Sequence, residues 1–224
     1  MIKTIVPAIQ MVKNYSNSFV VEFKDYCVLI DAGMDKKAKE IIEAIKKTGK
    51  GLKFVLITHA HLDHVNGLAK IKEEYPDLIV TSSQEEKNAV EGKEMIFPKG
   101  MKGFLFRIIS PFMGYKGVKV DKILKEGKFE NFKVLATPGH TKGSLSFLLR
   151  ISGKNVLFAG DLILNKEDKL CLPPEEFNFD KNQIVESLKK ISKIKIDILL
   201  PGHGEAIKES ANLKIKDFLS SFKS

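Results

Sequence analysis

The chain has 224 residues, of which 43% are hydrophobic and 29% are charged. A chain of this length can bury a sizeable core, and the composition excludes a disordered or fibrous protein. The formal net charge is +9, but only Arg107 and Arg150 are arginines among the 37 basic residues. Because arginine supplies the bidentate contacts that phosphate favours, and because the lysines are scattered along the chain, we expect no specific nucleic-acid partner.

Cysteine usage and apolar run length predict the compartment. The two cysteines, Cys27 and Cys171, are too few for a disulfide framework. No apolar run approaches the roughly 18 residues that a transmembrane helix needs. Residues 1–14 lack the pattern of a signal peptide. We therefore expect a cytoplasmic protein without a transmembrane segment.

The first part of the chain predicts strands followed by helices in alternation. Apolar or alternating stretches are separated by polar turns, and glycines or prolines end several of them. Strands are expected at residues 2–12, 17–23, 26–33, 54–57 and 78–82. Helices are expected at residues 36–47, 64–75 and 82–92. In the first helix Ile41, Ile42 and Ile45 share one face, which is typical of a helix that packs on a sheet.

Residues 95–119 are a stretch of a different kind. Large apolar residues are frequent in it, but prolines and glycines divide it into pieces too short to span a bilayer. Three interpretations stay open. The stretch covers the substrate pocket as a lid, packs between the subunits of a homodimer, or rests on a membrane surface.

The second part of the chain predicts a further alternation. Strands are expected at residues 120–124, 132–137, 144–151, 155–160 and 196–201, and helices at 180–194 and 213–222. In the first of these helices Ile184, Leu188 and Ile191 are expected to face inward. The chain contains neither an evident linker nor an internal repeat. This order of elements predicts one layered α/β domain over residues 1–224.

The stretch from residue 54 to residue 67 joins an apolar strand to a cluster of histidines. His59 and His61 are two residues apart, so their rings project to the same side of an extended backbone and can bind one ion. Asp63 and His64 follow where the chain turns into a helix, and a carboxylate suits the free N–H groups of a helix start. This loop can therefore serve two adjacent ions.

The remaining two of the five histidines stand in glycine-containing turns, His140 in TPGHT and His203 in PGHG. Asp161 ends the apolar stretch NVLFAGD. Pro138 and Gly139 are expected to stop a strand and let the backbone approach a metal closely. A lone histidine is usually an ordinary hydrogen-bonded ring. Here no histidine is left for such a role, which favours a metal site.

With its residues in this order, the chain resembles the metallo-β-lactamase-fold hydrolases, whose signature is His-x-His-x-Asp-His followed by a separate His, an Asp or Cys, and a final His. The resemblance spans nearly the whole chain. It implies an α/β fold of the metallo-β-lactamase type, a four-layer αββα sandwich with the ligands at one sheet edge. The implied ligand set is His59, His61 and His140 on one metal, Asp63, His64 and His203 on a second, and Asp161 between them.

Two roles stay open for Asp31. The resemblance implies that Asp31 lies under the metal loop and orients a ligand. The residues alone also fit a carboxylate that caps the helix after it. The two roles are compatible.

The implied cofactors are two divalent metal ions. Imidazole and carboxylate donors suit Zn²⁺ first, and iron or manganese also fit. Because such ions lower the pKa of bound water to about 7, a hydroxide held by both ions is expected to attack the substrate. Asp63 is expected to orient that hydroxide, which makes it the predicted catalytic residue.

The expected substrate is a small molecule with a good leaving group. Every tyrosine lies at or before Tyr115, so the loop between Asp161 and His203 offers no tyrosine as a general acid. An ester or thioester therefore fits best, as in the glyoxalase II-like group of the family. The alternatives are an oxidoreductase similar to the mononuclear-iron persulfide dioxygenases, a lactonase, a nuclease and a non-catalytic metal-binding protein.

Overall fold

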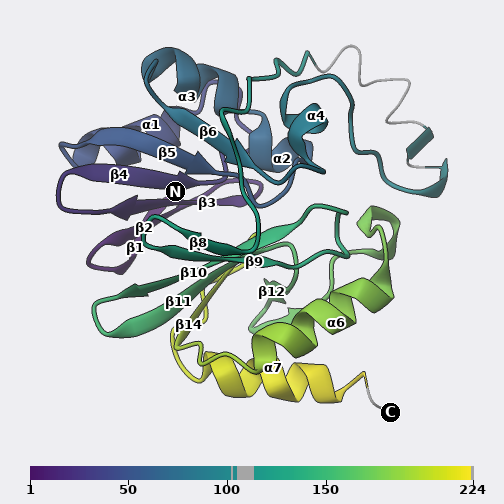
Figure 1. Cartoon of the computed structure of the whole chain (residues 1–224). Coiled ribbons are helices and arrows are strands. Elements are labelled where there is room, and N and C mark those ends of the chain that lie inside the picture. The colour runs from purple at the N-terminus through teal and green to yellow at the C-terminus, as the bar shows by residue number, and fades with distance from the viewer. Residues whose placement is uncertain (102, 105–113, 223–224) are drawn as a thin grey trace. The chain divides into compact units, whose positions relative to one another are not determined.

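The computed structural model describes residues 1–101, 103–104 and 114–222. The chain divides into two compact units. Unit 1 comprises Met1–Ile96 and Met113–Leu124, and unit 2 comprises Phe97–Phe112 and Lys125–Ser224. Each unit contains strands and helices, which confirms the predicted α/β class (Figure 1). That the whole of residues 1–224 forms one domain stays a prediction.

The sheet of unit 1 has seven strands that lie side by side in chain order. They are β1 (Ile2–Val6), β2 (Ile9–Lys13), β3 (Asn17–Glu22), β4 (Tyr26–Ile30), β5 (Gly51–Leu56), β6 (Ile79–Ser82) and β7 (Lys122–Ile123). The pairs from β1 to β4 are antiparallel, and the pairs from β4 to β7 are parallel. The single strand predicted at residues 2–12 is wrong. A turn at Pro7 and Ala8 divides it into β1 and β2, because proline favours turns and has no N–H for a sheet ladder.

The helices of unit 1 are α1 (Lys39–Lys47), α2 (Leu62–Val65), α3 (Leu68–Glu74) and α4 (Lys87–Val90). The continuous helix predicted at residues 64–75 is wrong, since α2 and α3 are separate. The Gly67 N–H donates to the carbonyl of Gly33 at 3.1 Å, and the carbonyl of Asp63 accepts from the Ser16 hydroxyl. A Cβ on Gly67 would lie 2.4 Å from the Ala32 carbonyl oxygen. Contact with the turn after β4 therefore ends the first helix.

The core of unit 1 lies between its sheet and its helices. The buried face of α1 presents Ile41 and Ile45, and α3 presents Leu68 and Ile71. These side chains cluster with buried strand residues such as Val55. Burying each large aliphatic side chain stabilises the fold by about 1.5–3 kcal/mol. The core thus holds in place the strand ends that carry the polar residues described below.

The main sheet of unit 2 has five strands in the order β14-β11-β10-β9-β8. They are β8 (Gly127–Phe129), β9 (Phe132–Ala136), β10 (Leu145–Ile151), β11 (Lys154–Gly160) and β14 (Ile198–Pro201). Strand β10 is antiparallel to both β9 and β11, and β11 is parallel to β14. It follows that β9, β11 and β14 run in the same direction.

Unit 2 also contains a small hairpin of β12 (Leu164–Lys166) and β13 (Lys169–Cys171), a 3₁₀ helix η1 (Glu175–Phe177), and the helices α6 (Lys181–Ser192) and α7 (Ala211–Ser220). The predictions of α6 and α7 are confirmed, with ends that differ by a few residues. Ile184, Leu188 and Ile191 are fully buried, as predicted. Strands β8, β12 and β13 were not predicted, because three-residue strands are too short for a pattern of alternation.

Residues 95–119 are described in part, because 102 and 105–113 lie outside the described residues. At one end, Lys99 donates from its backbone N–H to the Glu176 carbonyl at 2.6 Å and from Nζ to the Phe179 carbonyl at 3.0 Å. At the other end, the Tyr115 hydroxyl donates to the Val90 carbonyl at 2.8 Å. The lid, the subunit interface and the membrane contact all stay predictions. Among the residues that the structure describes, no helix combines the length and the apolar character needed to cross a membrane.

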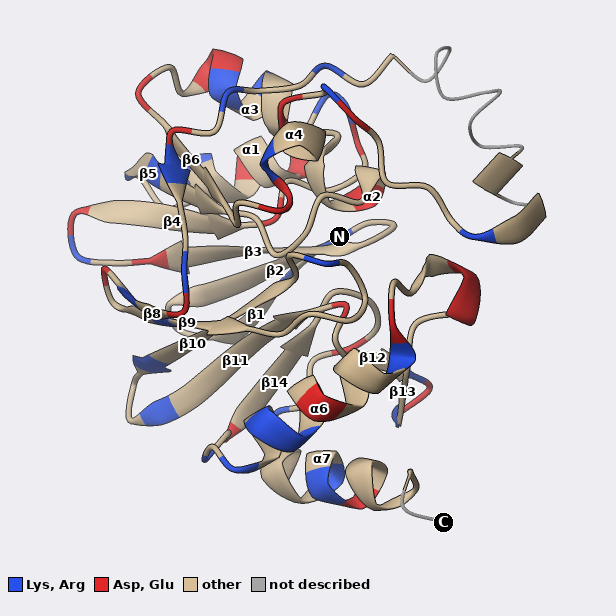
Figure 2. Cartoon of the chain, turned by 45° about the vertical axis from the view of Figure 1, so that its right-hand side comes forward, with Lys and Arg blue, Asp and Glu red and all other residues tan. Residues whose placement is uncertain are grey.

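Basic and acidic residues are interspersed along the helices and loops of each unit (Figure 2). Several lysines pair with carboxylates on the surface, for example Lys46 with Glu74 and Lys190 with Glu126. Exposed pairs of this kind contribute little to stability. They show that part of the positive charge in the described chain is locally balanced.

Candidate metal centre

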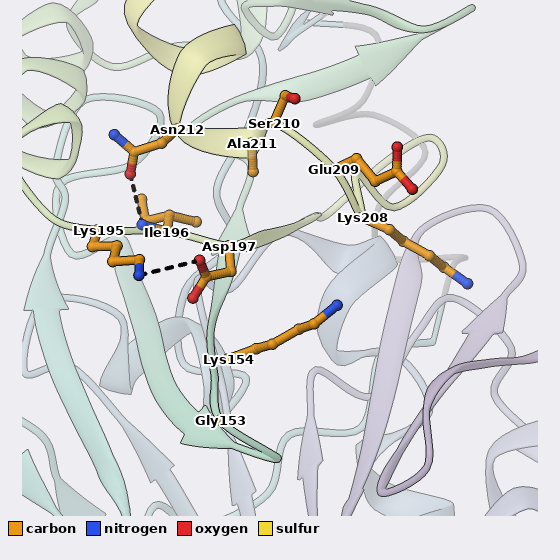
Figure 3. A pocket seen from close by; sticks show the side chains of 10 residues that line it. All are labelled: Gly153, Lys154, Lys195, Ile196, Asp197, Lys208, Glu209, Ser210, Ala211 and Asn212. Carbon is orange, nitrogen blue, oxygen red and sulfur yellow. Dashed lines mark hydrogen bonds and ion pairs between the residues drawn. The ribbon is translucent and has the colours of Figure 1, made fainter.

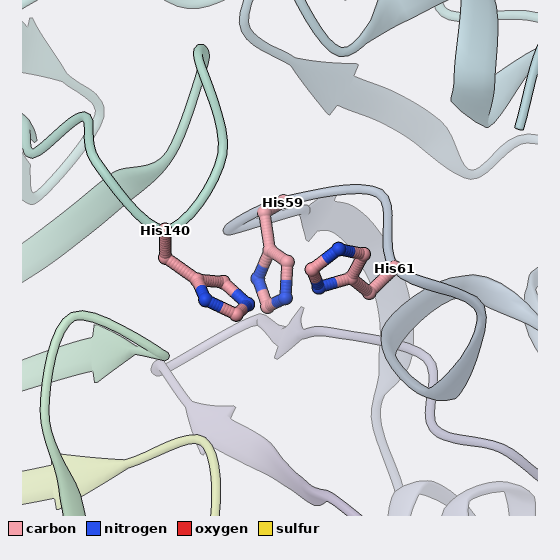
Figure 4. Close-up of side chains that lie close together, drawn as sticks. All are labelled: His59, His61 and His140. Atoms are coloured by element: carbon pink, nitrogen blue, oxygen red, sulfur yellow. The ribbon is translucent and has the colours of Figure 1, made fainter. Parts of the chain in front are cut away.

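In unit 1, the predicted ligands and Asp31 lie at the carboxyl ends of adjacent parallel strands. Asp31 directly follows β4, and His59 and His61 lie in the loop after β5. Because β4, β5 and β6 are parallel, their carboxyl ends meet at one edge of the sheet, which is where α/β proteins commonly bind ligands. The rings of His59 and His61 lie with their centroids 4.9 Å apart (Figure 4).

Asp63 and His64 lie in the first turn of α2, directly after this loop. The Asp63 Oδ2 atom is 3.5 Å from the Nε2 atom of His64. The rings of His59 and His64 have centroids 4.1 Å apart. Unit 1 therefore brings together all four predicted ligands of the signature.

Asp31 is 2% exposed and lies beneath the loop. Its Oδ1 atom accepts from the Thr58 N–H at 2.8 Å, and its Oδ2 atom accepts from the Thr58 hydroxyl at 2.7 Å. The same Oδ2 atom is 2.9 Å from the Nδ1 atom of His64. At the start of α1 a different carboxylate, Asp35, accepts from the backbone N–H groups of Lys37 and Lys39. The contacts of Asp31 thus fit the orienting role and not the helix cap.

Glu86 is a second buried carboxylate that contacts the loop after β5. Sequence reasoning missed it. It follows β6, is 2% exposed, and accepts from the Ala60 N–H at 2.8 Å. Ala60 lies between the predicted ligands His59 and His61, so this bond holds the segment that joins them. The sequence predicted a helix over residues 82–92, and nothing in its local pattern distinguishes a buried glutamate from its exposed neighbours.

In unit 2, the predicted ligands follow the carboxyl ends of the three strands that run in the same direction. His140 follows β9, Asp161 follows β11 and His203 follows β14. The Asp161 Oδ2 atom is 3.6 Å from the Nε2 atom of His140 and 3.4 Å from the Nε2 atom of His203. Unit 2 therefore brings its three predicted ligands together, with one carboxylate oxygen facing both rings.

Asn178 orients His140 and is a second residue that sequence reasoning missed. The His140 Nδ1 atom is 2.9 Å from the Asn178 Oδ1 atom, while Asn178 Nδ2 donates to the Pro173 carbonyl at 2.9 Å. Because a carbonyl only accepts, the amide of Asn178 must present its oxygen to His140. No sequence pattern could have linked the two residues, because 38 positions separate Asn178 from His140 and only the fold brings them together.

The close approach to a metal that we expected of Gly139 stays a prediction. The structure shows a further reason for a glycine at this position, because a Cβ there would lie 2.3 Å from the backbone nitrogen of Ile184, in α6. Gly139 also has φ 132°, a conformation that favours glycine. The close approach in this structure is therefore between the turn and a helix.

The turn at His203 is held by Asn165, in β12. The Asn165 N–H donates to the His203 carbonyl at 3.1 Å, and its side-chain amide donates to the Glu205 carbonyl at 2.9 Å. Gly204, at φ 92°, lies so close that a Cβ would be 1.6 Å from the Asn165 carbonyl oxygen. The unpredicted hairpin thus fixes the last ligand turn.

The imidazole nitrogens and carboxylate oxygens of the predicted ligands are atoms of the kinds that bind metal ions. Three histidines have Nδ1 at hydrogen-bond distance from an oxygen atom, which is the arrangement that leaves Nε2 to bind a metal. Two donor atoms bound at about 2.1 Å to one tetrahedral Zn²⁺ are about 3.4 Å apart. The separations of 3.4–3.6 Å between Nε2 and carboxylate oxygen within each unit are close to that value. Histidine and aspartate groups suited to bind metal are therefore present in the chain.

A separate cavity of about 430 Å³ lies in unit 2 (Figure 3). Its lining includes Lys154, Lys195, Asp197 and Lys208. Lys154 begins β11, and Lys195 and Asp197 shortly precede β14, whereas the predicted ligands Asp161 and His203 follow the ends of the same strands. The seven residues of β11 span roughly 20 Å. The cavity is therefore distinct from the candidate metal centre.

Comparison with known proteins establishes the family. Residues 12–203 match the metallo-beta-lactamase superfamily. The chain belongs to this superfamily, and it is a hydrolase-type, metal-binding member with the fold of that superfamily. The predicted fold class and the predicted family are thereby confirmed.

Individual relatives share the fold, but their names do not agree on one activity. The chain is 32% identical over 200 residues to the probable metallo-hydrolase YflN of Bacillus subtilis, covering 79% of this chain and 75% of YflN. It is 27% identical to the hydroxyacylglutathione hydrolase GloC of Haemophilus influenzae, covering 91% of this chain and 92% of GloC. It is also similar to the crystal structure of TTHA1623 in a di-iron-bound form, with TM-score 0.68, 25% identity, and coverage of 93% of this chain and 94% of that one.

Proposed function

We propose that the chain is a metal-dependent hydrolase of the glyoxalase II-like group, which cleaves a thioester or ester of a small molecule. The observation that carries this proposal is that four predicted donors lie together in unit 1 and three in unit 2, with buried hydrogen bonds that orient His59, His64 and His140. The similarity to a hydroxyacylglutathione hydrolase along nearly its full length supports the substrate class. The subgroup, the substrate and the reaction are proposed on that basis.

The proposed ligands form two sets that meet at Asp161. His59, His61 and His140 would hold one ion, and Asp63, His64 and His203 the other. Within unit 2, Asp161 Oδ2 faces His140 and His203, which belong to different sets, and this supports a shared carboxylate. Within unit 1, the short distance between Asp63 and His64 supports their common set. Zinc is proposed as the metal because of the imidazole-rich donors, and the di-iron form of TTHA1623 makes iron the main alternative.

The chemistry that two divalent ions supply when bound is Lewis acidity, which ionises a water near neutral pH and polarises the scissile carbonyl. The carboxylate of Asp63 accepts a hydrogen bond from the attacking water and so directs its lone pair. Asp31 and Glu86 keep the loop of ligands in one conformation, because both are buried and bonded to it. This preorganisation lets the site act without rearrangement during the reaction.

A thioester is the substrate class that best fits the residues around the site. A thiolate departs without a strong general acid, and no tyrosine follows Tyr115 in the sequence. The exposed aromatic residue near His140 is Phe179, whose backbone N–H donates to the His140 carbonyl at 2.9 Å. We propose that its ring, which Lys142 covers at 5.1 Å, contacts the acyl group of the substrate.

The setting of the enzyme is part of the same proposal. The two free cysteines support a reducing compartment, the cytoplasm. A small-molecule substrate and the lack of a specific nucleic-acid partner remain as proposed from the sequence. For residues 95–119 the three interpretations, as a lid, a homodimer interface or a membrane contact, also remain.

The proposal is tested by metal analysis of the purified protein, followed by assays with thioester, ester, lactone and persulfide substrates, each with matched metals. Two equivalents of zinc together with thioester hydrolysis would support it. One iron with oxygen uptake on a persulfide would instead assign the chain to the dioxygenases. A protein that binds no divalent ion would contradict both.

A further inference from the structure

Thr58 lies between strand β5 and the ligand His59, and it is 1% exposed. Its hydroxyl oxygen is 2.7 Å from Asp31 Oδ2 and 3.0 Å from His59 Nδ1. The same Oδ2 atom is 2.9 Å from His64 Nδ1. These four side chains therefore form a continuous hydrogen-bonded row, from His59 through Thr58 and Asp31 to His64.

The direction of each bond in this row follows from counting protons. A carboxylate only accepts, and a hydroxyl has one proton to donate. The Thr58 proton must go to Asp31, because the reverse orientation would set two oxygen lone pairs against each other at 2.7 Å. The Thr58 oxygen then has only lone pairs left for His59, so the Nδ1 atom of His59 carries a proton. The Nδ1 atom of His64 carries one for the same reason, since it faces Asp31 directly.

A neutral imidazole with its proton on Nδ1 presents the lone pair of Nε2, which is the form that can bind a metal through Nε2. Asp31 faces His64 directly, and the hydroxyl of Thr58 bridges Asp31 to His59. The hydroxyl thus extends the effect of one buried carboxylate to a second ring.

We propose that Thr58 is a positioning residue, which couples His59 to Asp31 so that a single carboxylate sets the tautomer and the ring orientation of two metal ligands. The inference rests on the proposed metal site. Since His59 and His64 are assigned to different ions, the row would link the two halves of that site.

A variant of Thr81 serves as the control that distinguishes this proposal from a purely structural role of Thr58. Thr81 is fully buried in the neighbouring strand β6, and its hydroxyl donates to the Val55 carbonyl at 2.9 Å. Thr81→Val therefore removes a buried hydroxyl from the same sheet without touching a ligand. Thr58→Val removes the coupling at nearly constant shape, and Thr58→Ser retains the hydroxyl.

The first experiment reads the tautomers of the metal-free protein by long-range ¹H–¹⁵N correlation NMR, at a pH where the spectra themselves show both rings to be neutral. In the wild type, His59 and His64 should both carry the proton on Nδ1. Thr58→Val should change the pattern of His59 and leave that of His64, and Thr81→Val should change neither. A wild-type His59 with its proton on Nε2, or a His59 pattern unaffected by Thr58→Val, would overturn the proposal.

The second experiment measures Zn²⁺ affinity by competition with a chelator. Thr58→Val should bind about 10–100-fold more weakly than the wild type, as expected when a ligand loses its hydrogen-bond partner. Thr58→Ser and Thr81→Val should retain the wild-type affinity. Equal losses in Thr58→Ser and Thr58→Val, or an unchanged affinity in Thr58→Val, would overturn the proposal.

Both readouts are independent of turnover and of each other. If Thr58→Val does not fold, the wild-type tautomers and the affinity of Thr58→Ser still decide the matter. A protein with the expected tautomers that hydrolyses no thioester would contradict the proposed function alone. A thioesterase whose His59 has the other tautomer would contradict this inference alone.

Discussion

The two units present their predicted ligands in different ways. Unit 1 carries four of them within the six residues from His59 to His64, on one loop and the helix start after it. Unit 2 carries three on separate turns, after β9, β11 and β14. The supporting residues differ as well, because unit 1 uses buried carboxylates and unit 2 uses the amides of Asn178 and Asn165.

This difference shows two ways to build a ligand set. In unit 1 the spacing along the chain already places the side chains together, and the fold has to hold the loop in one conformation. In unit 2 the spacing contributes nothing, and the ligands meet because three strands of one sheet have the same direction. Substitutions in unit 2 should therefore test how the predicted ligands are brought together. Substitutions in unit 1 should test how their side chains are oriented.

The largest effect is expected from Asp161→Ala, which removes the carboxylate that faces two histidines in unit 2. Metal binding and activity should be lost together, with kcat/KM reduced on the order of 10³-fold or more. Metal content and turnover are measured on the same preparation. Asp217→Ala, an exposed change on α7, is the control and should alter neither. Full turnover in a metal-free Asp161→Ala protein would contradict the assignment.

A large loss of stability is expected from Gly204→Ala, because its Cβ would overlap the carbonyl of Asn165 in the hairpin that holds the last turn. We expect the free energy of unfolding to fall by at least about 2 kcal/mol. Gly153→Ala is the matched control: Gly153 also has a positive φ, of 76°, but nothing lies within 4 Å of the added Cβ. It should cost about 1 kcal/mol. Urea denaturation compares the two, and equal losses would mean that the backbone contact is unimportant.

In unit 1, Asp31→Asn should weaken metal binding about 10–100-fold, because an amide cannot accept from all three donors that the carboxylate serves. Chelator competition measures the change. Asp35→Asn, at the start of α1, should leave the metal affinity as it is. Wild-type affinity in Asp31→Asn would refute the orienting role. It would mean that the spacing of the predicted ligands along the loop is sufficient without Asp31.

Substitutions of Glu86 test how much its hydrogen bond to Ala60 contributes to stability. Glu86→Ala leaves the buried Ala60 N–H without this acceptor and should lower the free energy of unfolding by about 1–3 kcal/mol. Glu86→Gln retains an oxygen for the same bond and should cost less. Denaturant titration of both proteins gives the comparison. The same loss in both variants would show that the charge of Glu86, and not its bond to Ala60, is what matters.

The smallest effect concerns the two thiols, one in each unit. Burial raises the pKa of both Cys27 and Cys171, so at a given pH each forms less of the reactive thiolate than it would in the unfolded chain. Cys27 is fully buried and Cys171 is half-buried. Iodoacetamide should therefore label Cys171 first, with a rate that increases as the pH rises, as followed by mass spectrometry. Equal labelling of Cys27 in the folded protein would show that unit 1 opens readily.

The sequence was sufficient for features that depend on neighbours along the chain. Strands such as β10 and β11 were predicted from short, largely apolar runs, and helix α6 was predicted because its apolar residues repeat with the helical period. The same reasoning placed His59 and His61 on one side of their loop. The order of the histidines and aspartates was enough to suggest the family, which the comparison then confirmed.

Only the tertiary structure decided the features that depend on contacts between distant residues. The split between α2 and α3 results from a bond between Gly67 and Gly33, and Glu86 and Asn178 became visible only where they meet Ala60 and His140. Buried polar groups need partners, and a partner 26 or 38 residues away leaves no periodic trace in the sequence. The types and order of the ligands could therefore be predicted from the chain, but the hydrogen bonds that orient them could not.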